Sequence, residues 1–281
     1  KDTLSLHDAL PISAVVNTPP DLAAAALLRP VLLETFARGE AWCRPLLAKR
    51  GLGDALVDPA LAFLAARGVA LRLGARVRGL DFADATVTGL RVDGEAHALG
   101  ADDRVVLATP PWITAALVPG LAPPPAYSAI LNVHFRLPDE MPAGPPFLGV
   151  VGGLAQWIFR RGPLVSVTVS AAEAHLDTPK DELAARIWAD VRRAFDIGAM
   201  PQPPARVITE KRATPLQTPE AARNRWSTWT RWRNLTLAGD WIATGLPATI
   251  ESAVRSGERA VTDLRRRRRR DHAGTDRQRT A

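Results

Sequence analysis

The sequence predicts a mixed α/β protein in which helical and sheet-rich parts of the chain are interleaved. Three observations support this fold class. The 281 residues are 47% hydrophobic, which is enough to bury a sizeable core in one large domain or two interleaved ones. The spacing of apolar residues changes between helical steps and the alternation typical of strands. A proline-rich stretch at 119–125 separates two strand-containing regions.

The N-terminal region reads first as helices and then as strands. Thr18–Asp21 has the prolines of a helix start, and an Ala/Leu-rich stretch follows it to about Phe36. Asp58 and Pro59 open a second helix, which ends at Gly68. Alternating or continuous apolar runs then predict strands at 69–73, 77–80, 86–92 and 104–108.

The region from 126 to 213 reads as a sheet with one long helix. Leu183, Ile187, Val191 and Phe195 recur at four-residue steps after the helix start at Thr178. The strands are predicted at 128–137, 147–152, 155–159, 164–170 and 206–211.

The closing segment reads as a short strand, a turn and a helix. The strand is expected at 235–237, the turn at Gly239–Asp240, and the helix from Thr244–Pro247 onward. Ile250, Ala253, Val254, Gly257, Val261 and Leu264 would form one face of this helix. A mid-helix glycine costs about 1 kcal/mol relative to alanine, so we expect a close packing partner at Gly257.

Composition excludes several classes of site. Cys43 is the only cysteine, which rules out an internal disulfide framework and a cysteine-based metal site. The five histidines show no metal-ligand spacing, so no metal is expected. No run of about twenty apolar residues predicts a transmembrane helix. Together these features favour a reducing, cytoplasmic location.

The positive charge is concentrated at the C-terminus. Residues 265–281 carry +6 of the formal net charge of +7, mostly in the run Arg265–Arg270. One terminal run is not the basic face with interleaved aromatic residues that nucleic-acid binding requires. We expect 265–281 to be a disordered tail, and the alternative is a peripheral contact with an anionic membrane surface.

The chain begins at Lys1 rather than Met, and residues 1–13 match nothing that follows. Their sequence, KDTLSLHDALPIS, reads as a translated sequencing adapter and lacks the regions of a signal peptide. We therefore expect residues 1–13 to be non-native and the true N-terminal part of the protein to be missing.

The strand, Gly–Asp turn and helix of the closing segment suit a negatively charged or polarisable ligand. A helix start offers unpaired N–H groups and about half a positive charge. Gly239 permits a close approach of the backbone, and Asp240 can accept hydrogen bonds from ligand hydroxyl groups. The alternative is an ordinary strand-to-helix connection with a capping aspartate.

Residues 234–257, NLTLAGDWIATGLPATIESAVRSG, resemble the C-terminal FAD motif of flavin amine oxidase-type proteins. More narrowly, they are similar to the squalene-associated hydroxysqualene dehydroxylases of hopanoid biosynthesis. Weaker similarity extends over nearly all of residues 14–264, at 17–20, 43–45, 51–53, 58–60, 74–77, 105–110 and 211–214.

This resemblance implies FAD as the cofactor and a partial Rossmann-like FAD-binding domain. The Gly–Asp turn would hold the ribityl and pyrophosphate groups, and the helix start would approach the flavin ring. The implied cofactor-binding residues are Gly239, Asp240, Trp241, Gly245, Leu246, Pro247, Ala248, Ile250, Val77, Ala108 and Pro110. The G-x-G-x-x-G fingerprint of such domains is absent from the chain, so we expect FAD binding by this chain alone to be weak and the chain alone to be inactive.

The resemblance also divides the chain. The FAD-binding domain would comprise 69–118 and 214–264, and an amine oxidase- or phytoene desaturase-like substrate domain would comprise 14–68 and 119–213. The substrate would be an apolar isoprenoid. Trp112, Trp157 and Phe159 would line its cavity, with plain core packing as the alternative for each.

The implied reaction is the reduction of hydroxysqualene to squalene, by loss of water and hydride transfer from reduced flavin. A carotenoid desaturase, which moves hydride in the opposite direction, is one alternative. An amine oxidase is disfavoured because Tyr127 is the only tyrosine available for an aromatic cage. A non-enzymatic membrane-surface module is the alternative from another class. The sequence identifies no catalytic residue, since Asp54 and Asp58 offer acid chemistry without a defined geometry.

Overall fold

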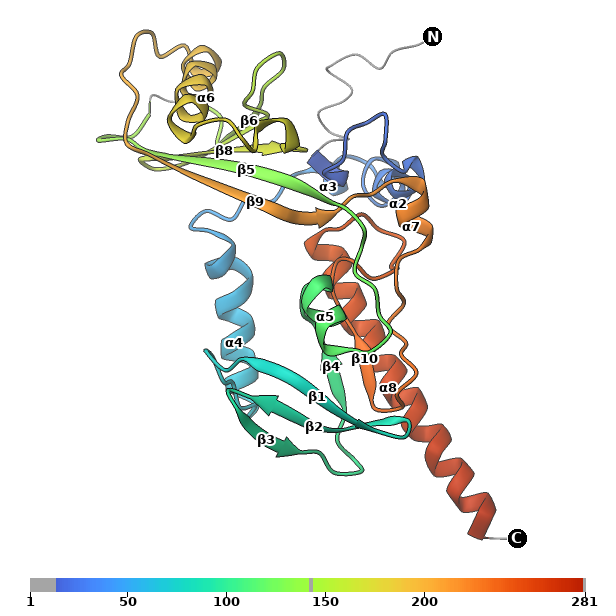
Figure 1. The fold of residues 1–281 in the computed structure, drawn as a ribbon. Helices are drawn as coiled ribbons and strands as arrows, with labels where there is room; N and C mark the ends of the chain where they lie inside the picture. The colour runs from blue at the N-terminus through green and yellow to red at the C-terminus, as the bar shows by residue number, and fades with distance from the viewer. Residues whose placement is uncertain (1–13, 142–143, 280–281) are drawn as a thin grey trace. The chain divides into compact units, whose positions relative to one another are not determined.

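The computed structural model describes residues 14–141 and 144–279, with side chains up to residue 267. Contacts divide the chain into two compact units, each assembled from two separate stretches. The first unit contains residues 14–62 and Ala126–Pro219, and the second contains Phe63–Pro125 and the residues from Glu220 onward (Figure 1). The sequence analysis placed these three boundaries at 68, 118 and 213. The mixed α/β class is confirmed, and the expected non-native segment 1–13 lies outside the described residues.

The first unit is built on a five-stranded antiparallel sheet with the strand order β6–β7–β8–β5–β9. Helix α6 (Lys180–Phe195) covers one face of this sheet (Figure 1). Its expected apolar residues pack against alternate residues of β5 and β8, so the core is a single layer between helix and sheet. The strands are β5 (Tyr127–Arg136), β6 (Phe147–Gly149), β7 (Trp157–Arg161), β8 (Leu164–Ser170) and β9 (Ala205–Pro215).

The N-terminal stretch docks onto one end of this sheet through polar side chains. The Asn17 amide donates to the Thr214 hydroxyl over 3.0 Å, and its carbonyl oxygen accepts from the Ala171 N–H over 2.9 Å. Thr18 accepts from the Gln217 N–H, and the Gln217 side chain donates to the Val16 carbonyl. These bonds commit residues 16–18 to the sheet, and residues 19–23 form a turn, so the helix expected from Thr18–Asp21 begins only at Ala25.

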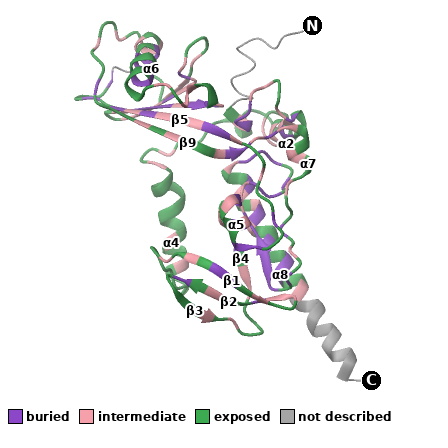
Figure 2. Ribbon diagram, viewed as in Figure 1, coloured by how far each residue is buried: buried purple, intermediate pink, exposed green. Residues whose placement is uncertain are grey.

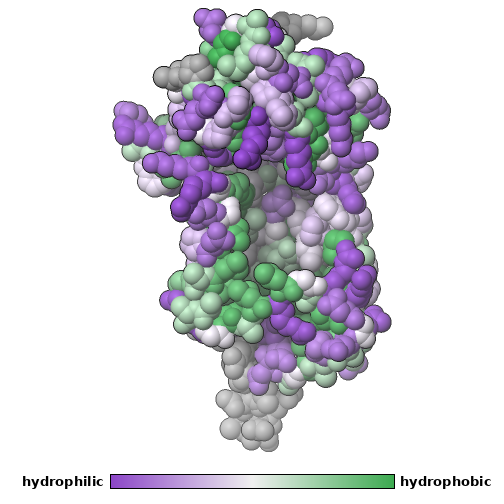
Figure 3. Space-filling model, turned by 90° about the vertical axis from the view of Figure 1, so that its left-hand side faces the viewer, coloured by the Kyte–Doolittle hydropathy of each residue, from purple (hydrophilic) through white to green (hydrophobic). Residues whose placement is uncertain are grey.

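Short helices follow the docked stretch. They are α2 (Ala25–Glu34), η1 (Phe36–Arg38), α3 (Glu40–Cys43), the π-helical η2 (Gly53–Val57) and α4 (Asp58–Ala65). Many of their apolar side chains are exposed, among them Leu56, Val57 and Phe63. Figure 3 shows hydrophobic side chains gathered around α4.

The second unit contains two small sheets and the C-terminal helix. Strands β1 (Val77–Ala83), β2 (Thr86–Val92) and β3 (Glu95–Ala98) form an antiparallel meander, and β4 (Val105–Leu107) pairs in parallel with β10 (Leu235–Leu237). Buried residues cluster along β10 and on one side of α8 (Figure 2). The helices of this unit among the described residues include α5 (Pro111–Leu117) and α8 (Ile250–Arg279), while the short helices η3 (Glu173–His175) and α7 (Pro219–Arg223) lie in the first unit and at the junction of the two stretches.

The strand expected at 69–73 does not form. Val69, Leu71 and Leu73 are exposed by 46%, 46% and 85%, and β1 begins only at Val77. Alternation alone does not make a strand, because a strand also requires a neighbour to accept its backbone hydrogen bonds. No described strand pairs with these residues.

Helix α8 buries a face that coincides only in part with the one expected. Leu264 is buried as expected, but Ile250, Val254 and Val261 are exposed, whereas Ser252 and Ser256 are fully buried. A Cβ added at Gly257 would meet no heavy atom within 4 Å among the described residues, so the expected close partner is not found there. The buried serines bond to the preceding turn, and this explains why a polar stripe faces inward.

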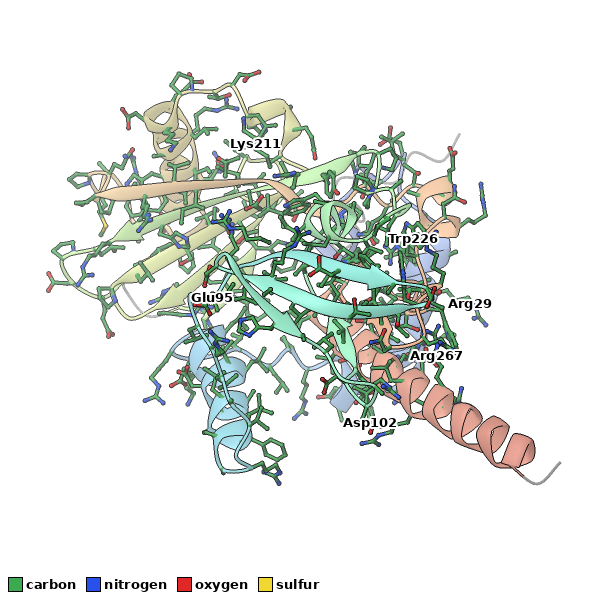
Figure 4. The ribbon with its side chains drawn as sticks, turned by 60° about the horizontal axis from the view of Figure 1, so that its bottom comes forward. Arg29, Glu95, Asp102, Lys211, Trp226 and Arg267 are labelled. Carbon is green, nitrogen blue, oxygen red and sulfur yellow. The ribbon has the colours of Figure 1, made fainter. Side chains whose placement is uncertain are left out.

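The chain remains helical where a disordered tail was expected, since α8 extends to Arg279. Arg267, labelled in Figure 4, anchors this extension. Its guanidinium donates to the Trp232 and Thr230 carbonyls over 2.6 and 3.0 Å and lies 4.0 Å from the centre of the Trp229 ring. Part of the arginine run is therefore used in packing rather than left in solvent.

Candidate cofactor-binding site

The carboxyl ends of two parallel strands bring together two of the predicted groups of site residues. Leu107 of β4 lies opposite Leu237 of β10, and the Ala238 N–H donates to the Leu107 carbonyl over 3.0 Å. Ala108–Pro110 therefore leaves the sheet beside Gly239–Asp240. The edge at the carboxyl ends of parallel strands is where open α/β sheets bind their ligands.

Gly239 has a backbone conformation that other residues avoid, with φ of +147°. A Cβ at this position would lie 2.4 Å from Nε1 of Trp241. The indole has no room to move, because Trp241 is 2% exposed and its Nε1 donates to the Thr109 carbonyl over 3.2 Å. A glycine is therefore required at position 239, both by its backbone conformation and by the tryptophan ring packed against it.

The buried carboxylate of Asp240 is only partly stabilised by the protein groups around it. Burial raises its pKa above the ordinary value of 3.8, and the N–H groups of Asp240 and Trp241 and the Arg225 guanidinium oppose that rise without cancelling it. A carboxylate with a raised pKa gains from further hydrogen-bond donors, such as ligand hydroxyl groups. This makes Asp240 the strongest candidate binding residue of the site.

Two arginines that the sequence analysis did not single out hold the loop after Asp240. Arg225 donates to the Leu246 carbonyl over 2.7 Å, and burial lowers its pKa while Asp240 opposes this effect. Arg259 of α8 donates to the Ala243 and Thr244 carbonyls, each over 3.1 Å. Both contacts join residues far apart in sequence, so no local pattern could have identified them.

The C-terminal helix meets the turn through its buried serines. The Gly239 N–H donates to the Ser256 hydroxyl over 2.8 Å, and the Ser252 hydroxyl lies 2.6 Å from that of Thr244. The Thr249 hydroxyl accepts from the Ser252 N–H, which makes Thr249 the cap of the helix. The helix begins at Ile250 and not at Thr244–Pro247, so its positive end lies a few residues later than expected.

The remaining predicted cofactor residues differ in exposure. Leu246, Pro247 and Ala248 are buried in the loop before α8, whereas Gly245 and Ile250 are exposed. Val77 opens β1 and packs on the apolar core of the second unit. The cofactor contacts assigned to these residues remain predictions.

The three predicted substrate residues fall in different parts of the fold. Trp112 lies in α5 of the second unit and is half-buried. Trp157 and Phe159 lie on β7 of the first unit, and both stack against Phe147 of β6, with ring centres 6.1 and 6.2 Å away. The structure thus brings Trp157 and Phe159 into one aromatic cluster.

The residues present fit the part of FAD that the closing segment would hold. The Gly239–Asp240 turn lies at the carboxyl ends of the two parallel strands, and Asp240 supplies an acceptor for ligand hydroxyl groups. Among the described residues there is no group of three or more His, Cys, Asp or Glu side chains suited to a metal ion. None of the helices described has the length and apolar character needed to cross a membrane.

A family model described as flavin containing amine oxidoreductase matches residues 12–141 and 154–265. The chain belongs to the flavin containing amine oxidoreductase family. Membership in this flavoprotein family confirms the family resemblance and the FAD cofactor inferred from the closing segment.

Curated relatives narrow the resemblance within this flavoprotein family. Proteins named hydroxysqualene dehydroxylase from Rhodopseudomonas palustris, Sinorhizobium fredii and Zymomonas mobilis are 44%, 42% and 42% identical to the chain, in each case over 88% of it. The chain spans 59% of the length of each of these relatives.

Solved structures share the flavoprotein fold at low sequence identity. Cyclohexylamine oxidase from Brevibacterium oxydans has a TM-score of 0.60 at 12% identity, covering 92% of this chain and 63% of its own. A protein from Pyrococcus furiosus has a TM-score of 0.57 at 13% identity, covering 92% of this chain and 62% of its own. These similarities concern the fold alone.

Proposed function

We propose that this chain forms part of an FAD-dependent enzyme that reduces hydroxysqualene to squalene. The observation that carries the proposal is 44% identity, over 88% of the chain, to a protein named hydroxysqualene dehydroxylase. Because the chain spans 59% of that relative, the activity is proposed for the whole protein.

In this proposal the Gly–Asp turn binds the ribityl and pyrophosphate groups of the cofactor. Asp240 accepts hydrogen bonds from ligand hydroxyl groups, which compensates the carboxylate that burial leaves under-stabilised. Arg225 and Arg259 keep the following loop in place by binding its carbonyl oxygens. When bound in its reduced form, FAD supplies the hydride that replaces the substrate hydroxyl group.

The substrate-side residues would handle the charge that the reaction creates. The hydroxyl group leaves with one proton as water, which places positive charge on an allylic carbon until the hydride arrives. Aromatic faces stabilise cations, by about 0.5–2 kcal/mol each. The Phe159 ring already has the Arg161 guanidinium 5.8 Å from its centre, which leaves Trp157 as the candidate for this role, and both rings lie in one aromatic cluster of the first unit. They also exclude water from an apolar chain lying against them.

A chimaera tests this proposal. Residues 14–265 would replace the matching segment of the Rhodopseudomonas palustris relative, and the purified protein would be incubated with hydroxysqualene and a flavin reductant. Squalene in the lipid extract is the expected result. A yellow, FAD-loaded chimaera that forms no squalene would contradict the proposal. Formation of new double bonds would instead indicate a carotenoid-type desaturase, and a colourless protein would favour a non-enzymatic module.

We also propose that the protein works in the cytoplasm, peripheral to an anionic membrane surface. The run Arg265–Arg270 supports this contact, since each basic residue near such a surface contributes about 1 kcal/mol. An apolar isoprenoid substrate resides in membranes, so a surface contact would place the enzyme beside its supply. Arg267 is engaged by the fold, so the proposal assigns the contact to the other arginines of the run.

A further inference from the structure

The five-stranded sheet of the first unit has a second face, opposite α6, which carries an ordered set of polar side chains. Along β5 and β8, every second residue enters the core under α6, and the residues between them lie on the other face. On that face His134 lies opposite Ser166, and Asn132 lies opposite Thr168. The His134 Nδ1 is 2.9 Å from the Ser166 hydroxyl, and the Thr168 hydroxyl donates to the Asn132 carbonyl oxygen over 2.8 Å.

Strand β7 places the aromatic residues directly beside these polar pairs. Phe159 lies opposite Ser166, and Trp157 lies opposite Thr168. The sheet register therefore forms a row that runs Phe159, Ser166, His134, with a second row beside it that runs Trp157, Thr168, Asn132. In each row the residue on β7 is aromatic, and the residues on β8 and β5 carry hydrogen-bonding side chains.

The composition of this face does not match a plain packing surface. A face buried only for stability would be apolar, because polar groups cost free energy when they lose water. Here Nε1 of Trp157 is buried without a hydrogen-bond partner among the described residues. A buried indole N–H without an acceptor is uncommon and calls for a partner such as a ligand oxygen.

His134 has hydrogen-bonding capacity left for a ligand. Its ring makes one hydrogen bond within the described residues, to Ser166, and this contact holds the ring in position. Burial and the nearby guanidinium groups of Arg161 and Arg206 lower the pKa of His134 below 6.5, so the ring is neutral at pH 7.

We propose that His134, oriented by Ser166, binds the hydroxyl group of the isoprenoid alcohol, while Trp157 and Phe159 contact the adjoining apolar chain. A long hydrocarbon with one hydroxyl group matches rows in which one hydrogen-bonding group stands beside aromatic rings. The inference rests on the proposed function for the choice of alcohol. To that function the inference adds a residue, His134, that binds the hydroxyl group, which hydroxysqualene has and squalene lacks.

The affinity for hydroxysqualene divided by the affinity for squalene, called here the affinity ratio, tests this assignment. Hydroxysqualene and squalene, delivered in the same detergent micelles, would be titrated into the chain, and tryptophan fluorescence would report binding. One hydrogen bond contributes about 1.5 kcal/mol at most, so we expect the alcohol to bind about tenfold more tightly. His134→Leu should bring the affinity ratio near one and leave the affinity for squalene unchanged. His134→Gln should restore part of the preference for the alcohol.

Ser166→Ala should lower the ratio by about threefold, because the ring loses the contact that orients it. His97→Leu is the matched control, since His97 is a half-buried histidine of the other unit, and its ratio should equal that of the unaltered chain. A ratio in His134→Leu equal to that of the unaltered chain would overturn the assignment. Absence of binding by the unaltered chain, or equal affinity for both lipids, would overturn it as well.

The chimaera separates this inference from the proposed function. Squalene formation with an unaltered KM in the His134→Leu chimaera would reject the role of His134 and leave the function standing. A His134-dependent affinity ratio without squalene formation would reject the reaction but not the hydroxyl-binding site. If both hold, His134→Leu should raise the KM for hydroxysqualene about tenfold.

Discussion

At the residue scale, Asp240 is held in a way that opposes stability and favours ligand binding. Burial raises its pKa, so the folded state binds its proton more tightly than the unfolded state does. The stability that this residue contributes is fully present below pH 3.8 and is lost as the pH rises through the folded-state pKa. At neutral pH the carboxylate therefore costs stability, as functional groups often do.

Asp240→Asn should raise the free energy of unfolding at pH 7 and remove part of the decrease in that free energy as the pH rises above 3.8. In the chimaera it should weaken FAD binding about tenfold, since an amide accepts ligand hydroxyl groups less well than a carboxylate. Urea unfolding and flavin titration measure the two effects. Asp102→Asn, at an exposed turn of the same unit (Figure 4), should change neither. A loss of stability in Asp240→Asn would show that the carboxylate serves the fold.

Gly239 makes a second residue-scale prediction, because the indole of Trp241 occupies the place of a side chain. Gly239→Ala should lower the free energy of unfolding by about 2–4 kcal/mol, through backbone strain and the steric clash together. Gly94→Ala is the control, since its φ is +96° but no heavy atom lies near the added Cβ. It should cost only about 1 kcal/mol. If urea unfolding showed the same loss of free energy for both variants, the indole of Trp241 would be able to move aside without an energetic penalty.

The residues of the cofactor site differ in how far the sequence could identify them. Gly239 and Asp240 can be proposed as candidate cofactor-binding residues from the sequence, because the strand, turn and helix around them are contiguous and resemble a family motif. Arg225 and Arg259 were missed, because each acts on carbonyl groups that lie 15–21 positions away along the chain. Backbone carbonyls have no sequence signature, so only coordinates could reveal such contacts.

At the element scale, helix α8 shows why apolar periodicity can indicate the wrong face. Leu264 of its apolar stripe is buried, but Ile250, Val254 and Val261 of the same stripe are exposed. The buried stripe is Ser252, Ser256 and Ala260, whose small side chains allow close approach and whose hydroxyl groups bond to the turn. By contrast, α6 was placed correctly, because its neighbour is an apolar sheet and periodicity alone decides the face.

Two substitutions in α8 distinguish these faces. Ala260→Leu should lower the free energy of unfolding by about 1–3 kcal/mol, because Ala260 is fully buried and has no space for three more carbons. Val254→Ser should change it by no more than about 0.5 kcal/mol, since Val254 is 54% exposed. Thermal or urea unfolding compares the variants. The reverse order of effects would show that the apolar stripe is the packed face.

At the scale of the whole molecule, both units are assembled from two stretches that are far apart in sequence. Composition and strand spacing alone predicted the elements, whereas the pairing of the stretches came from the family resemblance. The partnership of β4 with β10 joins residues about 130 positions apart, and no local signal specifies it. The sequence therefore predicted the elements of the fold better than the contacts between distant segments.

The arginine run gives a prediction that concerns the molecule as a whole. Replacing Arg268, Arg269 and Arg270 by glutamine keeps the contacts of Arg267 and removes three charges, worth about 3 kcal/mol at an anionic surface. Co-sedimentation with phosphatidylglycerol vesicles should therefore weaken by about a hundredfold, and binding to phosphatidylcholine vesicles should be weak for both proteins. Since exposed charges are screened by salt, binding of the unaltered chain should also fall at about 0.5 M NaCl. Vesicle binding that survives both the substitutions and the salt would locate the contact on the exposed apolar side chains of α4 and its neighbours, and the arginine run would then have no part in it.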